Sequence, residues 1–244
     1  MAGPGQRPGM LTPELDRHFV DIMCDCPYGL ERMAIYHQAC LSALPDQVMG
    51  DLLAAGYRRN GNVIYAMRCP DCAACVPIRL RHGRVQPSRS QRRTLARNHD
   101  LEVGIAPLAL PEENLDLLTR FLATRFPASQ SEARDYYSGF FCNSVTATLE
   151  IRYRAAGRLL GVSVVDLGEN WLNAVYFYFD PAESRRSPGT YNILYLADFC
   201  RQHQLEYLYL GYWIDEVAAM RYKARFLPHE ILGPRGWHAV PGAR

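Results

Sequence analysis

The chain has 244 residues, 48% of them apolar, and a formal net charge of +2 at pH 7. These values fit a soluble globular protein with one large or two small hydrophobic cores. No run of about 18 apolar residues occurs, so we expect no transmembrane helix. The Gly/Pro-rich start lacks the apolar segment of a signal peptide, and we expect a disordered tail over residues 1–20.

The first half of the chain is predicted to alternate short helices and strands. Asn60 and Gly61 indicate a turn, and Val76, Ile78 and Leu80 recur with the period of two that is typical of a strand. We expect helices over residues 27–41, 45–55 and 88–97, and strands over residues 63–67, 76–81 and 101–108.

The second half shows longer elements. Leu117, Leu118, Phe121 and Leu122 fall at helical spacing and predict a helix over residues 113–126, followed by a loop over 127–131. Three strands joined by Gly-containing turns predict an antiparallel meander over 146–155, 159–166 and 171–179. A helix over 188–202 and a strand over 206–214 follow. We expect an α+β protein with a smaller Cys/Arg-rich α+β domain (21–105) packed on a second domain (106–244).

Positive charge is concentrated in one segment. Residues 57–97 hold ten of the 27 basic residues and one of the 25 acidic residues, a local net charge of +9. The rest of the chain is therefore acidic, near −7, with 17 basic against 24 acidic residues. A basic segment in an acidic chain indicates a binding site for a polyanion.

A second candidate site lies at the start of the helix over 188–202. Ser187 fits the N-cap and Pro188 the first turn, while Arg186 comes just before them. Dipole and charge together favour an anion there, and Gly189 lets a ligand approach the backbone. The alternative is a capped helix with solvated arginines. The order of three antiparallel strands, turn, helix and strand resembles the core of GNAT-type acyltransferases, where such a turn binds a pyrophosphate.

The strand predicted over residues 206–214 and the segment that follows it form a third candidate site. Tyr212 and Trp213 flank Gly211, which indicates a bulge or a close approach of another part of the chain. Aromatic residues on both faces also fit a buried central strand. Lys223 is the only lysine among the 27 basic residues. It is either functional or simply left over from a strong bias toward arginine in the composition.

Cysteines form a fourth candidate. Three of them are spaced three residues apart in the basic segment, and a fourth near the N-terminus would complete a tetrahedral zinc or iron–sulfur site. These four residues are Cys26, Cys69, Cys72 and Cys75. The alternative is a set of buried or redox-sensitive free thiols. Eight cysteines in a chain without a signal peptide favour free thiols or metal ligands and a cytoplasmic protein.

Six motifs in order resemble the bacterial aminoacyl-tRNA–protein transferases, in the aspartate/glutamate leucyltransferase branch related to arginyl-tRNA–protein transferases. They lie at residues 56–62, 69–75, 90–93, 186–190, 207–214 and 220–226. The resemblance implies transfer of leucine from aminoacyl-tRNA to the α-amine of proteins that begin with Asp or Glu. Such an N-degron is marked for degradation by the N-end rule. It also implies no required cofactor and no membrane partner, and we expect a monomer.

The resemblance also implies residue roles. Tyr212 and Lys223 are expected at the reacting groups, and the two halves are expected to close around one cleft. The expected substrate-binding residues are Arg58, Arg59, Asn62, Tyr65, Gln91, Arg92, Arg93, Arg186, Gly189, Thr190 and Trp213. Three other readings stay open: an arginyl-tRNA–protein transferase, an acetyl-CoA-dependent N-acetyltransferase, and an RNA-binding module with a structural metal.

Overall fold

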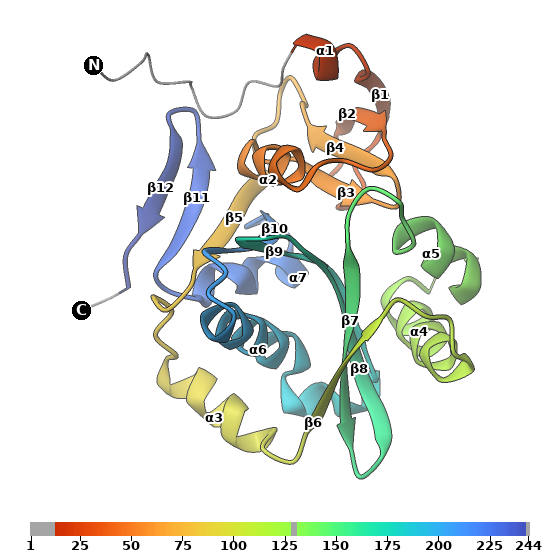
Figure 1. The fold of residues 1–244 in the computed structure, drawn as a ribbon, viewed down its shortest axis with the longest axis vertical. Helices are drawn as coiled ribbons and strands as arrows, with labels where there is room; N and C mark the ends of the chain where they lie inside the picture. The colour runs from red at the N-terminus through yellow and green to blue at the C-terminus, as the bar shows by residue number, and fades with distance from the viewer. Residues whose placement is uncertain (1–12, 128–130, 243–244) are drawn as a thin grey trace.

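The computed structural model describes residues 13–127 and 131–242 (Figure 1). Of the expected tail, residues 1–12 lie outside the described residues. The remainder departs from that expectation, because Pro13–Asp16 form the short helix α1 and Phe19 is buried in the core. The part of the chain from residue 13 to 20 therefore belongs to the folded unit.

A four-stranded antiparallel sheet is built from the N-terminal segment, in the order β1-β2-β4-β3. Its strands are β1 (Val20–Asp25), β2 (Met33–Cys40), β3 (Arg58–Asn60) and β4 (Val63–Met67). The helix predicted over 27–41 is wrong, since β2 pairs with β1 on one side and β4 on the other. The apolar residues of this short segment fit either period, and pairing with two neighbours decides in favour of a strand. Helix α2 (Asp46–Ala54) was predicted correctly.

An eight-stranded sheet forms the centre of the molecule, in the order β12-β11-β5-β10-β9-β8-β7-β6. The strands are β5 (Val76–Arg81), β6 (Glu102–Pro107), β7 (Thr148–Ala155), β8 (Arg158–Leu167), β9 (Trp171–Phe179), β10 (Tyr207–Trp213), β11 (His229–Gly233) and β12 (Gly236–Val240). All neighbours are antiparallel except β9 and β10. Strand β5 lies between β10 and β11, so the expected division at residue 105 does not separate the two sheets.

Helices cover both faces of the large sheet (Figure 1). Helix α6 (Pro188–Gln202) packs on one face, and α3 (Arg89–Arg97) packs against α6. Helices α4 (Glu112–Arg125) and α5 (Ala133–Phe140) pack on the other. Strands β7, β8 and β9, the 3₁₀ turn η1 (Pro181–Arg186), α6 and β10 reproduce the acyltransferase-like core, and the α+β class is confirmed. No helix within the described ranges is long and apolar enough to cross a membrane.

Strands β9 and β10 pair over only three residues and then separate. Their last pair is Tyr209 with Asn173, and β10 bulges immediately afterwards at Gly211, whose φ is +82°. The predicted bulge is therefore confirmed. It frees the end of β10 from β9 and places Tyr212 opposite the loop that joins α2 to β3.

Candidate functional site

Tyr212 stands at the meeting point of the two sheets. Its side chain is 3% exposed, and its hydroxyl donates to the carbonyl oxygen of Gly56 at 3.2 Å. The amide of Met67 donates to the same hydroxyl at 3.4 Å. The rings of Tyr28 and Tyr65 lie 6.4 and 6.5 Å from its own. Burial raises the pKa of Tyr212, so the hydroxyl stays protonated and fixed.

Lys223 lies on the main-chain side of Tyr212. It belongs to the 3₁₀ turn η2 (Tyr222–Arg225), and its Nζ donates to the carbonyl oxygen of Tyr212 at 2.8 Å. Burial of the amine, with a smaller contribution from the nearby Arg58 guanidinium, lowers the pKa of Lys223 to about 7. Among the described residues Lys223 forms no ion pair. The amine therefore exchanges its proton near neutral pH.

Arg58 fills the opening between β9 and β10. Its Nη2 donates to the carbonyl oxygen of Ala174 at 3.3 Å, while its buried Nε and Nη1 have no hydrogen-bond partner. The guanidinium occupies the space where a side chain at Gly211 would begin. Its carbon lies 6.0 Å from the centre of the Tyr212 ring. No acid in the described ranges pairs with this cation.

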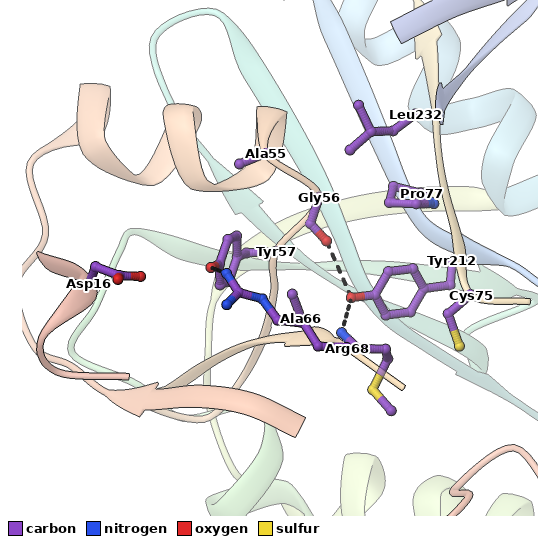
Figure 2. Close-up of a pocket in the computed structure, with 11 residues that line it drawn as sticks. Asp16, Ala55, Gly56, Tyr57, Ala66, Arg68, Cys75, Pro77, Tyr212 and Leu232 are labelled. Carbon is purple, nitrogen blue, oxygen red and sulfur yellow. Dashed lines mark hydrogen bonds between the residues drawn. The ribbon is translucent and has the colours of Figure 1, made fainter. Parts of the chain in front are cut away.

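A pocket of about 390 Å³ opens beside the Tyr212 hydroxyl (Figure 2). Its lining combines apolar walls with one basic and one acidic side chain. The lining residues are Asp16, Ala55, Gly56, Tyr57, Ala66, Met67, Arg68, Cys75, Pro77, Tyr212 and Leu232. A second cavity of about 10 Å³ shares Gly56, Tyr57 and Pro77 with it and is lined by Arg58. The unpaired guanidinium therefore lies on a cavity next to the pocket, not on the pocket lining itself.

Arg58, Tyr65, Tyr212 and Lys223, which the sequence singled out, are brought together here. Trp213 departs from this group, since it packs half-buried against the core around α6. Its indole N–H is buried without a hydrogen-bond partner. The role of each of these residues in binding or catalysis stays a prediction.

Three expected substrate-binding residues hold the fold together instead. Arg59 forms a buried ion pair with Asp166 through two hydrogen bonds of 2.7 and 2.9 Å. Asn62 exchanges hydrogen bonds with Ser144. Gln91 completes the capping box of α3 and donates to the carbonyl oxygen of Arg225 at 3.1 Å. Because these polar groups are already used within the protein, substrate binding by Arg59, Asn62 and Gln91 is not supported.

The α3 arginines and the turn at 186–190 adjoin each other, but neither lines the pocket. Arg186 binds Asp100 through hydrogen bonds of 2.7 and 2.9 Å and Glu183 at 2.9 Å. Gly189 packs against Tyr222, and the Thr190 amide bonds within its own turn. Arg92 and Arg93 are exposed on α3. The expectation of one cleft enclosing both regions is therefore not met by the pocket.

The four candidate metal ligands gather near the pocket. Burial and the neighbouring thiols of Cys26, Cys69 and Cys72 raise the pKa of Cys75 to about 12. The amide of Ile35 donates to Sγ of Cys69 at 3.4 Å. All eight cysteines are free. Within residues 13–127 and 131–242, no group of three or more Cys, His, Asp or Glu side chains is placed to hold a metal ion. The metal site stays a prediction.

Sequence reasoning missed several pocket residues. Arg68 was counted only as part of the basic segment, and Asp16 fell in the expected tail. Tyr57 was noted only as part of the motif at residues 56–62 and was given no role, since its place depends on how β3 meets β10. Arg68 donates from Nη2 to the Tyr57 hydroxyl at 3.0 Å, which fixes both at the pocket.

Comparisons with known proteins cover nearly the whole chain. The family described as "Arginine-tRNA-protein transferase" matches with its N terminus at residues 24–93 and its C terminus at 113–233. The aspartate/glutamate leucyltransferase of Methylobacillus flagellatus is 41% identical over 237 residues, covering 94% of this chain and 96% of that protein. The chain belongs to the arginine-tRNA-protein transferase family. The resemblance inferred from the six motifs is confirmed.

A second relative of the family agrees with the first. The aspartate/glutamate leucyltransferase of a Shewanella species is 42% identical over 199 residues, covering 79% of this chain and 82% of the relative. Among solved structures, the C-terminal domain of a putative lysylphosphatidylglycerol synthetase from Agrobacterium fabrum covers 74% of this chain and 57% of that chain, with 12% identity and a TM-score of 0.46. A likeness at that level does not bear on function.

Proposed function

We propose that this member of the arginine-tRNA-protein transferase family transfers leucine from leucyl-tRNA to the α-amine of proteins that begin with Asp or Glu. The observation that carries the proposal is the 41% identity, over 94% of the chain, to an aspartate/glutamate leucyltransferase. The product gains an N-terminal leucine, which marks it for degradation by the N-end rule. The reaction takes place in the cytoplasm, where charged tRNA is available, and a monomer suffices for it.

The chemistry needs little from the protein beyond positioning. The neutral α-amine attacks the carbonyl carbon of the ester, a C–N bond forms, and the bond to the tRNA 3′ oxygen breaks. The amine proton ends on that oxygen. Because an α-amine has a pKa near 8, a substantial fraction is neutral at physiological pH without a protein base. Holding ester and amine together then accounts for most of the acceleration.

Tyr212 and Lys223 are proposed to organise the site. The Tyr212 ring forms a wall of the pocket, and its hydroxyl and carbonyl oxygen are both held, by the loop at Gly56 and by Lys223. Lys223 therefore acts through Tyr212 as a positioning residue. The free N–H groups of Arg58 add positive charge beneath the pocket, which favours an anionic substrate group and the oxyanion of the transition state.

The exposed face of α3 is proposed to dock the tRNA. Six arginines on α3 and the neighbouring turns are exposed and form no ion pair among the described residues: Arg84, Arg89, Arg92, Arg93, Arg97 and Arg185. Such a surface attracts a phosphate backbone without reading its sequence. It lies apart from the pocket, which suits a tRNA whose body and 3′ end are held at different places.

The acetyl-CoA reading is not favoured by any contact. Arg58 fills the opening between β9 and β10. The Arg186 guanidinium, beside the proposed anion-binding turn, already donates hydrogen bonds to Asp100 and Glu183. A pyrophosphate would have to displace both carboxylates. The hypothesis of an RNA-binding module assigns no ligand to the pocket beside Tyr212.

The deciding experiment supplies leucyl-tRNA or arginyl-tRNA, radiolabelled in the amino acid, together with peptides beginning with Asp, Glu, Arg or Lys. We expect labelled leucine on the Asp and Glu peptides alone. Transfer from arginyl-tRNA would change the donor to arginine. Absence of transfer from both donors, with tRNA still bound, would refute the enzyme assignment in favour of an RNA-binding module.

A further inference from the structure

The pocket beside Tyr212 is lined by one cation, Arg68, and a second cation, Arg58, lies close to the Tyr212 ring. Arg68 is exposed at the end of β4, and its guanidinium is held by the Tyr57 hydroxyl at 3.0 Å. Neither Arg68 nor Arg58 forms an ion pair among the described residues. Buried cations are normally paired, so the unpaired Arg58, whose guanidinium carbon lies 6.0 Å from the Tyr212 ring, and the unpaired Arg68 on the pocket lining favour an anionic ligand.

The pocket also carries one negative charge at a different place. Asp16 is exposed and lies beyond Tyr57, on the opposite side from Pro77 and Leu232 (Figure 2). The lining also includes the small apolar side chains of Ala55 and Ala66. A volume of about 390 Å³ is enough for one residue of a peptide and part of the next.

We infer that this pocket binds the N-terminal acidic residue of the acceptor protein, with Arg68 holding its side-chain carboxylate and Asp16 its α-ammonium group. The inference rests on the proposed function and names the part of the site that selects the acceptor. Arg58 contributes its charge from beside the Tyr212 ring, outside the pocket lining. Tyr212 separates the pocket from Lys223.

The pairing of charges favours this ligand over the two other parts of the reaction. The leucyl end of leucyl-tRNA carries an α-ammonium group that Asp16 could hold, but it has no carboxylate for Arg68. A tRNA phosphate has no positive group for Asp16. An N-terminal Asp or Glu carries a carboxylate and an ammonium group a few bonds apart. These two groups match the one cation, Arg68, and the one anion, Asp16, on the pocket lining.

Binding of peptides without tRNA tests the inference directly. Fluorescence anisotropy would compare labelled peptides that begin with Asp, Asn or acetylated Asp and are otherwise identical. We expect the protein to bind the Asp peptide at least tenfold more tightly than either of the others. In Arg68→Glu and Arg68→Gln, the preference for Asp over Asn should disappear, and in Asp16→Asn the preference for a free over an acetylated N-terminus should disappear.

Arg201→Glu is the matched control, because Arg201 is an exposed arginine on α6 whose only ion pair among the described residues is with Asp198 of the same helix. It should bind all three peptides as the unaltered protein does. Circular dichroism would establish that each variant is folded. The glutamine variant removes the charge of Arg68 without adding an acid, so it separates loss of the carboxylate contact from repulsion.

Two results would overturn the inference. One is unchanged affinity of a folded Arg68→Glu variant for the Asp peptide. The other is weaker binding of leucyl-tRNA with unchanged peptide binding, which would assign the pocket to the donor. Because peptide binding needs no turnover, Arg68-dependent binding without leucine transfer would refute the proposed function and leave the acceptor pocket standing.

Discussion

Arg59 in β3 and Asp166 in β8 form an ion pair in which both side chains are completely buried. The pair joins the small sheet to the large one, and the carbonyl oxygens of Gly61 and Phe141 accept further bonds from the guanidinium. Thr148 and Asn173 donate to the carboxylate. The two sheets are thus held by one polar network whose members depend on each other.

Replacement of Arg59 by Met should lower the free energy of unfolding by about 3–5 kcal/mol, because it leaves the Asp166 carboxylate buried without a cation. Urea denaturation measures this loss. The double replacement Arg59→Met with Asp166→Leu should recover most of it, since no charge then remains buried. A loss below about 1 kcal/mol in the single variant would show that the network is not what joins the sheets.

Gly211→Ala should disrupt the site from β10. The new methyl group would overlap the Arg58 guanidinium, and a φ of +82° is strained for any residue with a side chain. We expect a loss of stability of about 1–3 kcal/mol and a strong loss of transfer. Combining it with Arg58→Ala should relieve the overlap but not the backbone strain. A double-mutant cycle by thermal unfolding should therefore show coupling between the two positions.

Lys223→Ala should lower the rate of leucine transfer at least tenfold while the protein stays folded, because Tyr212 loses the group that holds its carbonyl oxygen. Lys223→Met supplies a control of similar length. Measurement of kcat and KM separately distinguishes positioning from substrate binding. A variant with near-normal transfer would remove Lys223 from the site.

The same residue should make stability depend on pH. Its pKa is about 7 in the folded protein and near 10.4 in an unfolded chain, so between these values the unfolded state binds more protons. Stability should therefore rise with pH from 7 to 10, by about 1 kcal/mol per unit once solvent screening is allowed for. This rise should be absent in Lys223→Met, which urea denaturation at several pH values would measure.

Arg92→Glu combined with Arg93→Glu should weaken tRNA binding without regard to sequence. The slope of log affinity against log salt should become less steep by about 2, because about one counterion is released per phosphate contact. Peptide binding should not change, since neither residue lines the pocket. Filter binding at several salt concentrations measures the slope, with Arg201→Glu as control. An unchanged slope of log affinity against log salt would show that the tRNA body does not bind at α3.

Local signals predicted most elements. Pro87 and Ser88 indicated the start of α3, and the apolar spacing indicated α4, because both depend on neighbours in sequence. Strand β2 was taken for a helix, since its identity depends on pairing with β1 and β4. Helix α5 was missed because Tyr, Ser, Gly and Phe are not strong helix formers, and its burial against α4 supplies the stability.

The site was predictable only where one residue stood out by itself. Gly211 in an aromatic strand and the single lysine led to Tyr212 and Lys223. Arg68 and Asp16 could not be found, because the pocket exists only where segments distant in sequence meet. The Met67 amide and the Tyr212 hydroxyl, which meet there, are 145 residues apart.

Strand β5 is synthesised early, but it can pair with its neighbours in the sheet only late in synthesis. Its two neighbours, β10 and β11, begin at Tyr207 and His229, so more than half of the chain must leave the ribosome before either edge is covered. Until then the Arg79 and Ile78 backbone groups stay open to wrong partners. The C-terminal half expressed alone would likewise present two unmatched edges, so we expect it to aggregate and not to fold independently.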